Sequence, residues 1–281
     1  MVDDAVLDLT ALLPNAQWAT DMIRLLEAGP DALRQVRSAS AEAAGSARLP
    51  LDRVHLLAPI PRPRKNVFCV GLNYLDHAKE AARGSGRPLK LPTSPVYFTK
   101  PPTGIIGPDA NIMLDESVTK ELDYEVEFAI VIGVAGVNIP ESEAMAHVFG
   151  YTIVNDISAR DVQRRHGQWF KGKSLDTGCP LGPWIVPTAD MPDPANLDVS
   201  LRVNGQVMQS SNTRQFLFSL ARLVSDLSIG MTLEPGDIIA TGTPGGVGYA
   251  RTPPFFLKDG DVVEAEVQGI GVLRNPVRAV K

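Results

Sequence analysis

The stretch from Leu122 to Asp161 constrains this chain most, because it places carboxylates inside strongly apolar sequence. Its first part, DYEVEFAIVI, predicts a strand whose apolar run lacks polar alternation, as in strands covered on both faces. Side chains alternate along a strand, so Glu125 and Glu127 point the same way. A second apolar run, 150–154, ends in Asn155-Asp156. Carboxylates are therefore brought to partly buried positions, where they need a cationic partner.

Two interpretations of these acids remain open on spacing alone. Three carboxylates with no nearby cysteine suit a hard divalent cation, Mg²⁺ or Mn²⁺ before Ca²⁺. The plainer alternative is that Glu125 and Glu127 pair with lysine or arginine on a solvated strand face, which is a common arrangement.

Charge and composition exclude several classes of protein. The 281 residues carry a net charge of −5 and no long basic run, so nucleic acid is not expected as a partner. No apolar stretch approaches the roughly 20 residues of a membrane span. The first residues, MVDDAVLDLT, lack the pattern of a signal peptide. Two cysteines, Cys69 and Cys179, indicate a reducing compartment without a disulfide framework, so we expect a cytoplasmic protein that does not bind membranes.

Proline and glycine residues divide the chain into two parts. We predict that residues 1–62 form a small N-terminal domain, in which the helical spacing of apolar residues is interrupted at Gly29-Pro30. A proline-rich connector, 59–63, places the boundary near residue 62. The rest, 63–281, predicts a strand-rich α+β domain with short helices, one of them over Thr213–Leu227.

Several polar positions are candidates for chemistry. His77 and Glu80 share a predicted helix face, so the carboxylate can orient the imidazole, or both can hold a water molecule for general base catalysis. A solvated helix face explains the same spacing.

Other polar segments also allow two interpretations. Residues 81–93 are predicted to form either a lid over a site or an ordinary surface loop. Lys100 ends a predicted strand and either meets an anionic substrate or is solvated. A basic cluster follows Asp156 and either neutralises the acids, attracts an anion or is solvated: Arg160, Arg164, Arg165, Lys171 and Lys173.

Two glycine-rich segments need separate treatment. The segment 167–174 fits the phosphate-loop pattern G-x-x-x-x-G-K-S, but no apolar strand precedes it and glycines and prolines follow it, so we reject a nucleotide site. The segment 241–248, TGTPGGVG, allows two interpretations. Its backbone N–H groups and Thr243 bind a carboxylate, or its glycines simply form an ordinary turn.

Taken together, these residues resemble the fumarylacetoacetate hydrolase family. The matching segments lie in family order and cover roughly residues 66–281: GLNYLDHAKE (71–80), YFTKP (97–101), DYEVEFAIVIG (123–133), NDISARDVQ (155–163), GQWFKGKSLDTGCPLGPWIV (167–186) and TGTPGGVG (241–248). The resemblance implies a mixed β-roll or barrel-like catalytic domain beside the small N-terminal α+β domain. It also implies a homodimer that acts on a small anionic molecule.

The same resemblance implies roles for nine residues. The ligands of Mg²⁺ or Mn²⁺, for which Ca²⁺ can substitute, are Glu125, Glu127 and Asp156. The catalytic residues are His77, Glu80 and Lys173. The substrate contacts are Lys100, Gln163 and Thr243.

Members of the family that this chain resembles catalyse more than one reaction. We expect hydrolysis of a carbon–carbon bond in 2,4-dioxo acids such as acylpyruvates, fumarylpyruvate or dioxo sugar acids, with His77 activating water and Lys173 stabilising the enolate. The alternative is decarboxylation or isomerisation of oxaloacetate-like or 2-hydroxy-dienedioate substrates at the same metal site. Some relatives carry an arginine where this chain has Leu72, so the particular substrate does not transfer. A non-catalytic binding module is disfavoured because the other polar positions are filled.

Overall fold

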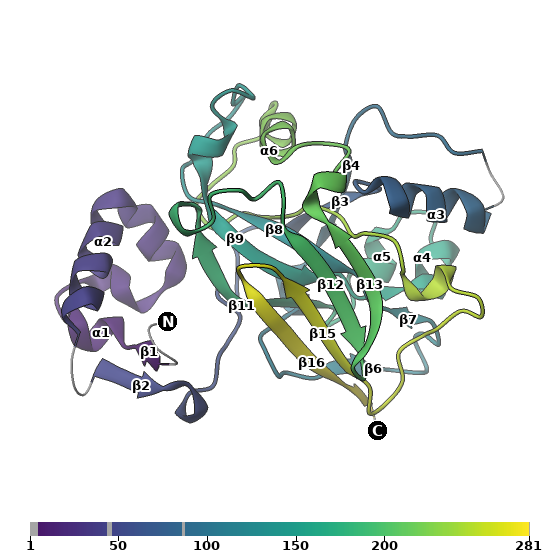
Figure 1. The fold of residues 1–281 in the computed structure, drawn as a ribbon, viewed down its shortest axis with the longest axis horizontal. Helices are drawn as coiled ribbons and strands as arrows, with labels where there is room; N and C mark the ends of the chain where they lie inside the picture. The colour runs from purple at the N-terminus through teal and green to yellow at the C-terminus, as the bar shows by residue number, and fades with distance from the viewer. Residues whose placement is uncertain (1–4, 44–46, 86–87, 281) are drawn as a thin grey trace.

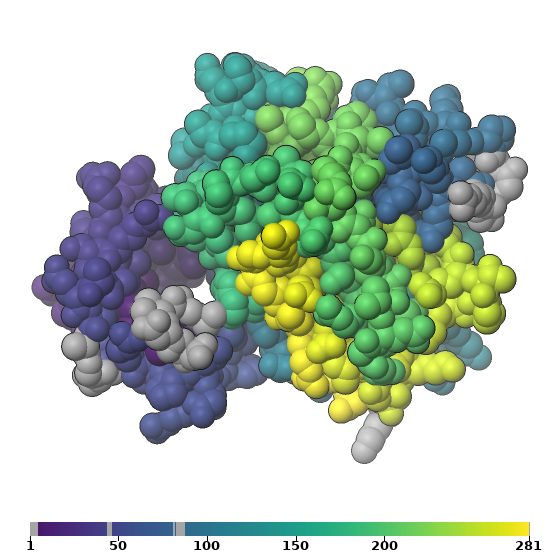
Figure 2. Space-filling view, in the orientation of Figure 1, coloured from purple at the N-terminus to yellow at the C-terminus, as the bar shows by residue number. Residues whose placement is uncertain are grey.

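The computed structural model describes residues 5–43, 47–85 and 88–280. A small N-terminal lobe lies at one end of a larger strand-rich body (Figure 1). The space-filling view shows the lobe as a distinct mass beside that body (Figure 2). The lobe consists of β1 (Ala5–Leu7), α1 (Leu9–Leu12), a 3₁₀ turn (Gln17–Thr20), α2 (Met22–Glu42), β2 (Arg48–Pro50) and a 3₁₀ turn (Leu51–Arg53).

Two sheets form the body. The seven-stranded sheet has the order β4-β3-β14-β8-β9-β11-β5, with β3 (Val67–Gly71), β4 (Val96–Lys100), β5 (Ile105–Ile106), β8 (Val126–Ile132), β9 (Val148–Asn155), β11 (Cys179–Pro187) and β14 (Ile238–Ala240). The five-stranded sheet has the order β13-β12-β15-β16-β6, with β6 (Ile112–Leu114), β12 (Asp198–Val203), β13 (Gln206–Asn212), β15 (Val262–Val267) and β16 (Gly271–Ala279). A two-stranded sheet pairs β7 (Leu122–Asp123) with β10 (Ser158–Ala159).

Four α-helices complete the described body: α3 (Leu75–Ser85), α4 (Arg160–Arg165), α5 (Phe170–Lys173) and α6 (Leu220–Ser228). Short 3₁₀ turns lie at Pro102–Gly104, Ala144–His147, Thr188–Asp190, Thr213–Gln215 and Gly248–Ala250. Helices α3, α4 and α5 lie together at the end of the body away from the N-terminal lobe (Figure 1). Among the described helices, none combines the length and apolar character needed to cross a membrane.

The hydrophobic core explains the apolar run that opened the sequence analysis. All seven residues of β8 are buried, because it lies inside the larger sheet and the smaller sheet packs across it (Figure 1). Apolar residues of both sheets, such as Phe128 on β8 and Leu201 on β12, belong to one buried cluster. The architecture is the strand-rich α+β fold that the sequence pattern predicts, and its curled, half-barrel sheet agrees with the β-roll or barrel-like domain that the resemblance implies.

The N-terminal lobe packs on the larger sheet through α2. Leu26 is buried in one cluster with Ala58, Ile60 and Val67. The predicted interruption lies inside α2, where Gly29 adopts a φ of 75°. A domain boundary near residue 62 stays a prediction.

The helix predicted over Thr213–Leu227 is confirmed only for its second part, α6 (Leu220–Ser228), and is wrong for residues 216–219. A 3₁₀ turn ends at Gln215, and α6 starts after Ser219, whose hydroxyl accepts from the Arg222 N–H. Between them, the Leu217 N–H donates to the backbone carbonyl of Asn73 at 2.8 Å. The Phe218 N–H donates to Oδ1 of the Asn73 side chain, also at 2.8 Å. These tertiary hydrogen bonds keep the segment out of the helix.

The rejection of the phosphate loop is confirmed. Helix α4 precedes the 167–174 segment where the motif requires a strand. The four-residue α5 lies inside the segment, and the strand β11 follows where a helix is required. The candidate lid at 81–93 is described only in part: α3 extends to Ser85, residues 88–93 contain no helix or strand, and 86–87 lie outside the described residues.

Candidate metal centre and active site

Three buried carboxylates converge where β8 and β9 lie side by side. Glu125, Glu127 and Asp156 each present an oxygen within 4.8 Å of the others. The antiparallel register brings this about, because Val126 pairs with Asn155. The Asp156 N–H also donates to the Glu125 carbonyl at 2.8 Å. Two segments that are separate in sequence therefore meet as one anionic cluster.

Buried cations surround part of this cluster. The Lys173 ammonium donates to Glu125 Oε2 at 2.7 Å and to Asp156 Oδ2 at 2.5 Å. Arg160 donates through Nη2 to Glu125 Oε1 at 2.5 Å. Burial raises the pKa of Glu125, but the charges of Lys173 and Arg160 outweigh it and hold that pKa well below its usual range. These two cations therefore favour the ionised form of Glu125.

Glu127 is compensated far less. Among the described residues it accepts one hydrogen bond, from the Gly242 N–H at 2.9 Å. Burial, together with the negative charges of Asp156 and Glu125, raises the pKa of Glu127 well above its ordinary value. Gly242 has a φ of 102°, a conformation that favours glycine. The glycine is what allows this N–H to reach the carboxylate.

The charge balance and the donor chemistry both fit a divalent cation. In the described site, four buried carboxylates face three buried cationic side chains: Asp123, Glu125, Glu127 and Asp156 against Lys100, Arg160 and Lys173. One buried negative charge is left without a cationic partner. Three converging carboxylate oxygens are the hard donors that Mg²⁺ and Mn²⁺ prefer, so Glu125, Glu127 and Asp156 would hold such an ion.

Lys100 lies in a different place from the one its sequence context suggests. Its ammonium is buried and donates to Asp156 Oδ1 at 2.6 Å and to the Ile157 carbonyl at 2.9 Å. It does not line the cavity described below. The interpretation of Lys100 as a substrate contact is therefore replaced by one in which it positions Asp156.

Lys100→Met should destabilise the fold. Removing one partner of a buried ion pair leaves the other charge uncompensated, which costs roughly 3–5 kcal/mol. We expect urea denaturation to show a loss of this size, whereas Lys171→Met, at an exposed position nearby, should leave the midpoint unchanged. Equal stability of the two variants would contradict the positioning role.

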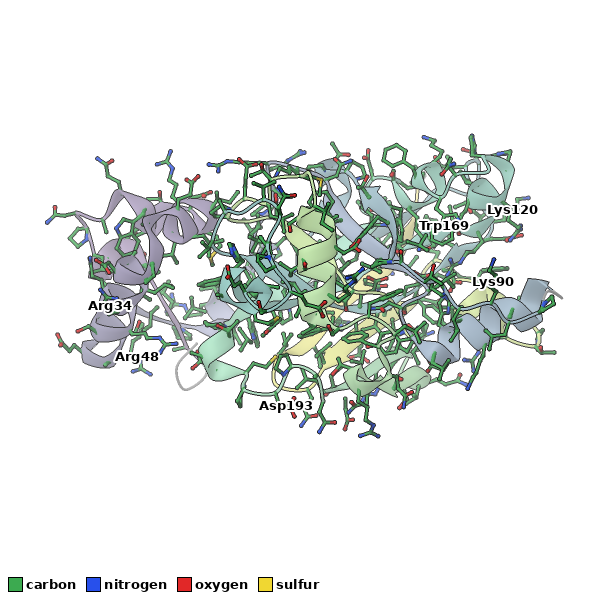
Figure 3. The ribbon with its side chains drawn as sticks, turned by 90° about the horizontal axis from the view of Figure 1, so that it is seen from above. Arg34, Arg48, Lys90, Lys120, Trp169 and Asp193 are labelled. Carbon is green, nitrogen blue, oxygen red and sulfur yellow. The ribbon has the colours of Figure 1, made fainter. Side chains whose placement is uncertain are left out.

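A cavity of about 720 Å³ opens over the carboxylates. Its wall contains Glu125 and Glu127 from the carboxylate cluster, Lys173 beside them, and His77 from α3. Trp169, also in the wall, lies far from Arg34 and Arg48 of the N-terminal lobe (Figure 3). Every described residue that lines the cavity belongs to the body.

The structure brings His77 and Glu80 together as the helical spacing predicts. His77 Nδ1 lies 3.4 Å from Glu80 Oε2, and His77 is 8 % exposed. Both Glu80 oxygens accept from the Gly246 N–H, at 3.0 and 3.1 Å. A Cβ at Gly246 would lie 2.3 Å from the Met208 carbonyl oxygen, so no larger residue fits there. With Nδ1 facing Glu80, Nε2 of His77 is left for a ligand in the cavity.

The glycine-rich segment 241–248 thus contacts both the carboxylate cluster and the His77–Glu80 pair. Its N–H groups hold the protein's own carboxylates, Glu127 and Glu80. Thr243 lines the cavity, and its hydroxyl accepts from Gln209 Nε2 at 2.8 Å. Gln209 in turn accepts from the Val126 N–H at 3.0 Å, which ties the segment to β8. Sequence reasoning missed Gln209, and no local signal marks it.

Arg160 is the most important residue that sequence reasoning left without a role of its own. It is 6 % exposed, and its Nε donates to Asp123 Oδ2 at 2.8 Å. Its Nη1 donates to Gln163 Oε1 at 3.3 Å, which orients a predicted substrate contact on the cavity wall. The acidic alternation at Asp123, Glu125 and Glu127 is the sequence signal that points to a buried cation here.

The chain belongs to the fumarylacetoacetate hydrolase family. The family sequence model described as Fumarylacetoacetate (FAA) hydrolase C-terminal matches residues 66–278. Oxaloacetate tautomerase YisK of Bacillus subtilis (strain 168) is 49% identical over 233 residues, 83% of this chain and 76% of that protein. The mitochondrial oxaloacetate tautomerase Fahd2a of Rattus norvegicus is 46% identical over 260 residues, 91% of this chain and 79% of that protein.

Solved structures share the fold. A fumarylacetoacetate hydrolase from psychrophilic Exiguobacterium antarcticum has a TM-score of 0.84 and 42% identity, covering 98% of this chain and 92% of that one. A 5-carboxymethyl-2-hydroxymuconate delta-isomerase from Mycobacterium smegmatis has a TM-score of 0.72 and 45% identity, covering 84% and 87%. Maleylpyruvate hydrolase from Sphingobium sp. SYK-6, solved with manganese(II) and pyruvate, has a TM-score of 0.81 and 30% identity, covering 100% and 95%.

Proposed function

We propose that this protein is a Mg²⁺- or Mn²⁺-dependent tautomerase of oxaloacetate or a closely similar short 2-oxo dicarboxylic acid. One observation carries the proposal: His77, which faces Glu80, lines the same cavity as Glu125 and Glu127 of the carboxylate cluster. Two relatives above 45% identity are named oxaloacetate tautomerases, and a solved relative is named an isomerase. These names favour the isomerase alternative over the hydrolysis that we expected first.

The chain's own residues account for the proton transfers. A divalent ion held by Glu125, Glu127 and Asp156 would supply Lewis-acid polarisation of a 2-oxo acid, which makes its C3 protons more acidic. His77, oriented by Glu80, takes a proton from C3 through Nε2. Two of the three Lys173 N–H bonds point to Glu125 and Asp156, so the third remains to donate to the 2-oxygen as negative charge develops. The 2-oxygen then takes up one proton, from His77 or from solvent, in place of the one that C3 lost, so that the reaction balances without consuming water. Ketonisation of the enol follows the same transfers in reverse.

The test is to follow the enol absorbance of freshly dissolved oxaloacetic acid with Mg²⁺, with Mn²⁺ and with EDTA. We expect metal-dependent acceleration of ketonisation, with no more pyruvate by NMR than in a protein-free sample with the same metal ion. Formation of pyruvate and CO₂ faster than in that sample would indicate decarboxylation and contradict the proposal.

Hydrolysis is the second candidate, because the same His77–Glu80 pair is suited to activating water and the maleylpyruvate hydrolase shares the fold. Acetylpyruvate and fumarylpyruvate should be assayed alongside oxaloacetate. Metal-dependent release of pyruvate from either, without tautomerisation of oxaloacetate, would favour the hydrolase. The homodimer and the cytoplasmic location stay predictions, the first testable by light scattering.

A further inference from the structure

Tyr249 lies directly after the glycine-rich segment and is held by the same buried carboxylate as Arg160. The Gly248 N–H donates to Asp123 Oδ1 at 2.7 Å, and the Tyr249 N–H donates to Asp123 Oδ2 at 3.1 Å. Asp123 also accepts from Arg160 Nε at 2.8 Å. A Cβ at Gly248 would lie 2.0 Å from the Phe255 carbonyl oxygen, so the backbone beside Tyr249 has no freedom to shift.

The ring and the hydroxyl of Tyr249 have different environments. The Arg160 guanidinium carbon lies 4.6 Å from the ring centroid, a cation–π contact that fixes the ring. The residue lines the cavity, and within the described parts of the chain its hydroxyl has no hydrogen-bond partner. Burial raises the pKa of the Tyr249 phenol, and the negative charge of Glu125 adds to this against the opposing charge of Arg160. The hydroxyl therefore stays protonated and can donate a hydrogen bond.

The position of this donor relative to the carboxylate cluster suggests its use. Arg160 spans from Glu125 to Asp123, so a single guanidinium separates the cluster from the Tyr249 ring. A four-carbon molecule held at the cluster by its first two carbons would have its far end inside the same cavity, whose wall includes Arg160, Gln163 and Tyr249. Gln163 also lines this cavity. Its Oε1 accepts from Arg160, which leaves its amide N–H groups as further donors.

We propose that Tyr249 is a specificity-determining residue, whose hydroxyl donates a hydrogen bond to the distal carboxylate of a four-carbon dicarboxylate. The proposal deepens the proposed function and rests on it for the identity of the substrate. A hydrogen bond to a charged group changes affinity by roughly 10- to 100-fold. Because the ring stays in place without its hydroxyl, the effect falls on recognition and not on the fold.

Tyr249→Phe tests this directly, since it keeps the ring under Arg160 and removes only the hydroxyl. We expect the KM for oxaloacetate to rise roughly 10- to 100-fold while kcat changes less than threefold and the thermal midpoint stays unchanged. Tyr97→Phe is the matched control: that hydroxyl donates to Asp226 at 3.2 Å, away from the cavity wall. A KM for Tyr249→Phe within twofold of the wild type overturns the proposal.

Binding of two stable ligands separates this proposal from the function itself. Malate and 2-hydroxybutanoate have the same chain length, and malate carries a carboxylate where the other has a methyl group. With Mg²⁺ present, calorimetry should show that wild type prefers malate and that Tyr249→Phe loses most of the preference. Equal weakening of both ligands, or no preference in the wild type, overturns the role of Tyr249. Absence of oxaloacetate turnover in the wild type defeats only the proposed function, because the binding comparison still decides on Tyr249.

Discussion

Glu127→Gln should abolish metal-dependent turnover while making the metal-free protein more stable. Glutamine keeps the shape of the side chain but removes one of three anionic ligands, so we expect metal affinity and kcat/KM to fall at least a hundredfold. Glu127 has no ion-pair partner among the described residues, so removing its charge leaves no buried cation unpaired. Relief of that buried charge should stabilise the metal-free fold by on the order of 1–3 kcal/mol.

The sign of the pH dependence follows from the raised pKa of Glu127. A carboxyl group whose pKa is higher in the folded than in the unfolded state costs stability above the unfolded pKa, and the cost grows until the folded pKa is passed. The gain from Glu127→Gln should therefore be small near the unfolded value of 4.5 and larger at pH 8. Chemical denaturation in EDTA at both pH values measures it.

Glu116→Gln, at an exposed position, is the control and should change neither stability nor turnover. A marked loss of metal-free stability in Glu127→Gln would show that Glu127 serves the fold as an ordinary ion-pair partner. That outcome would favour ion pairing over metal binding for these carboxylates, on buried strands and not on the solvated strand face of the plainer interpretation.

His77→Ala should leave metal binding intact and lower kcat by roughly 10²- to 10⁴-fold. The imidazole lines the cavity but is not one of the three clustered ligands, so its loss removes the proton acceptor and not the metal site. Titration with Mn²⁺ measures the affinity, and enol decay measures the rate. Near-normal turnover would remove His77 from the mechanism.

Two further variants sharpen the assignment. Glu80→Gln keeps a group that can accept from the Gly246 N–H but loses the charge that orients His77, so its kcat should fall between that of the wild type and that of His77→Ala. Lys79→Ala, exposed on the same helix, should behave as wild type. Equal losses in Lys79→Ala and His77→Ala would point to unfolding of α3.

Local pattern was sufficient where neighbours in sequence are also neighbours in space. The unbroken apolar run predicted the buried β8, and the i, i+3 spacing predicted that His77 and Glu80 meet. Pattern failed where tertiary contacts compete with it. The helix predicted over Thr213–Leu227 is divided because the Asn73 side chain and backbone capture the segment between its two halves.

The sequence by itself determined the chemistry available to this protein: hard oxygen donors on two apolar strands, an imidazole–carboxylate pair and a set of basic residues. Only the tertiary structure decided which charges meet. Strand register joins Glu125 and Glu127 to Asp156, and packing sends Lys100 behind Asp156 while it buries Arg160 against Asp123. A buried charge is stable only beside its partner, and partners far apart in the chain are chosen by the fold as a whole.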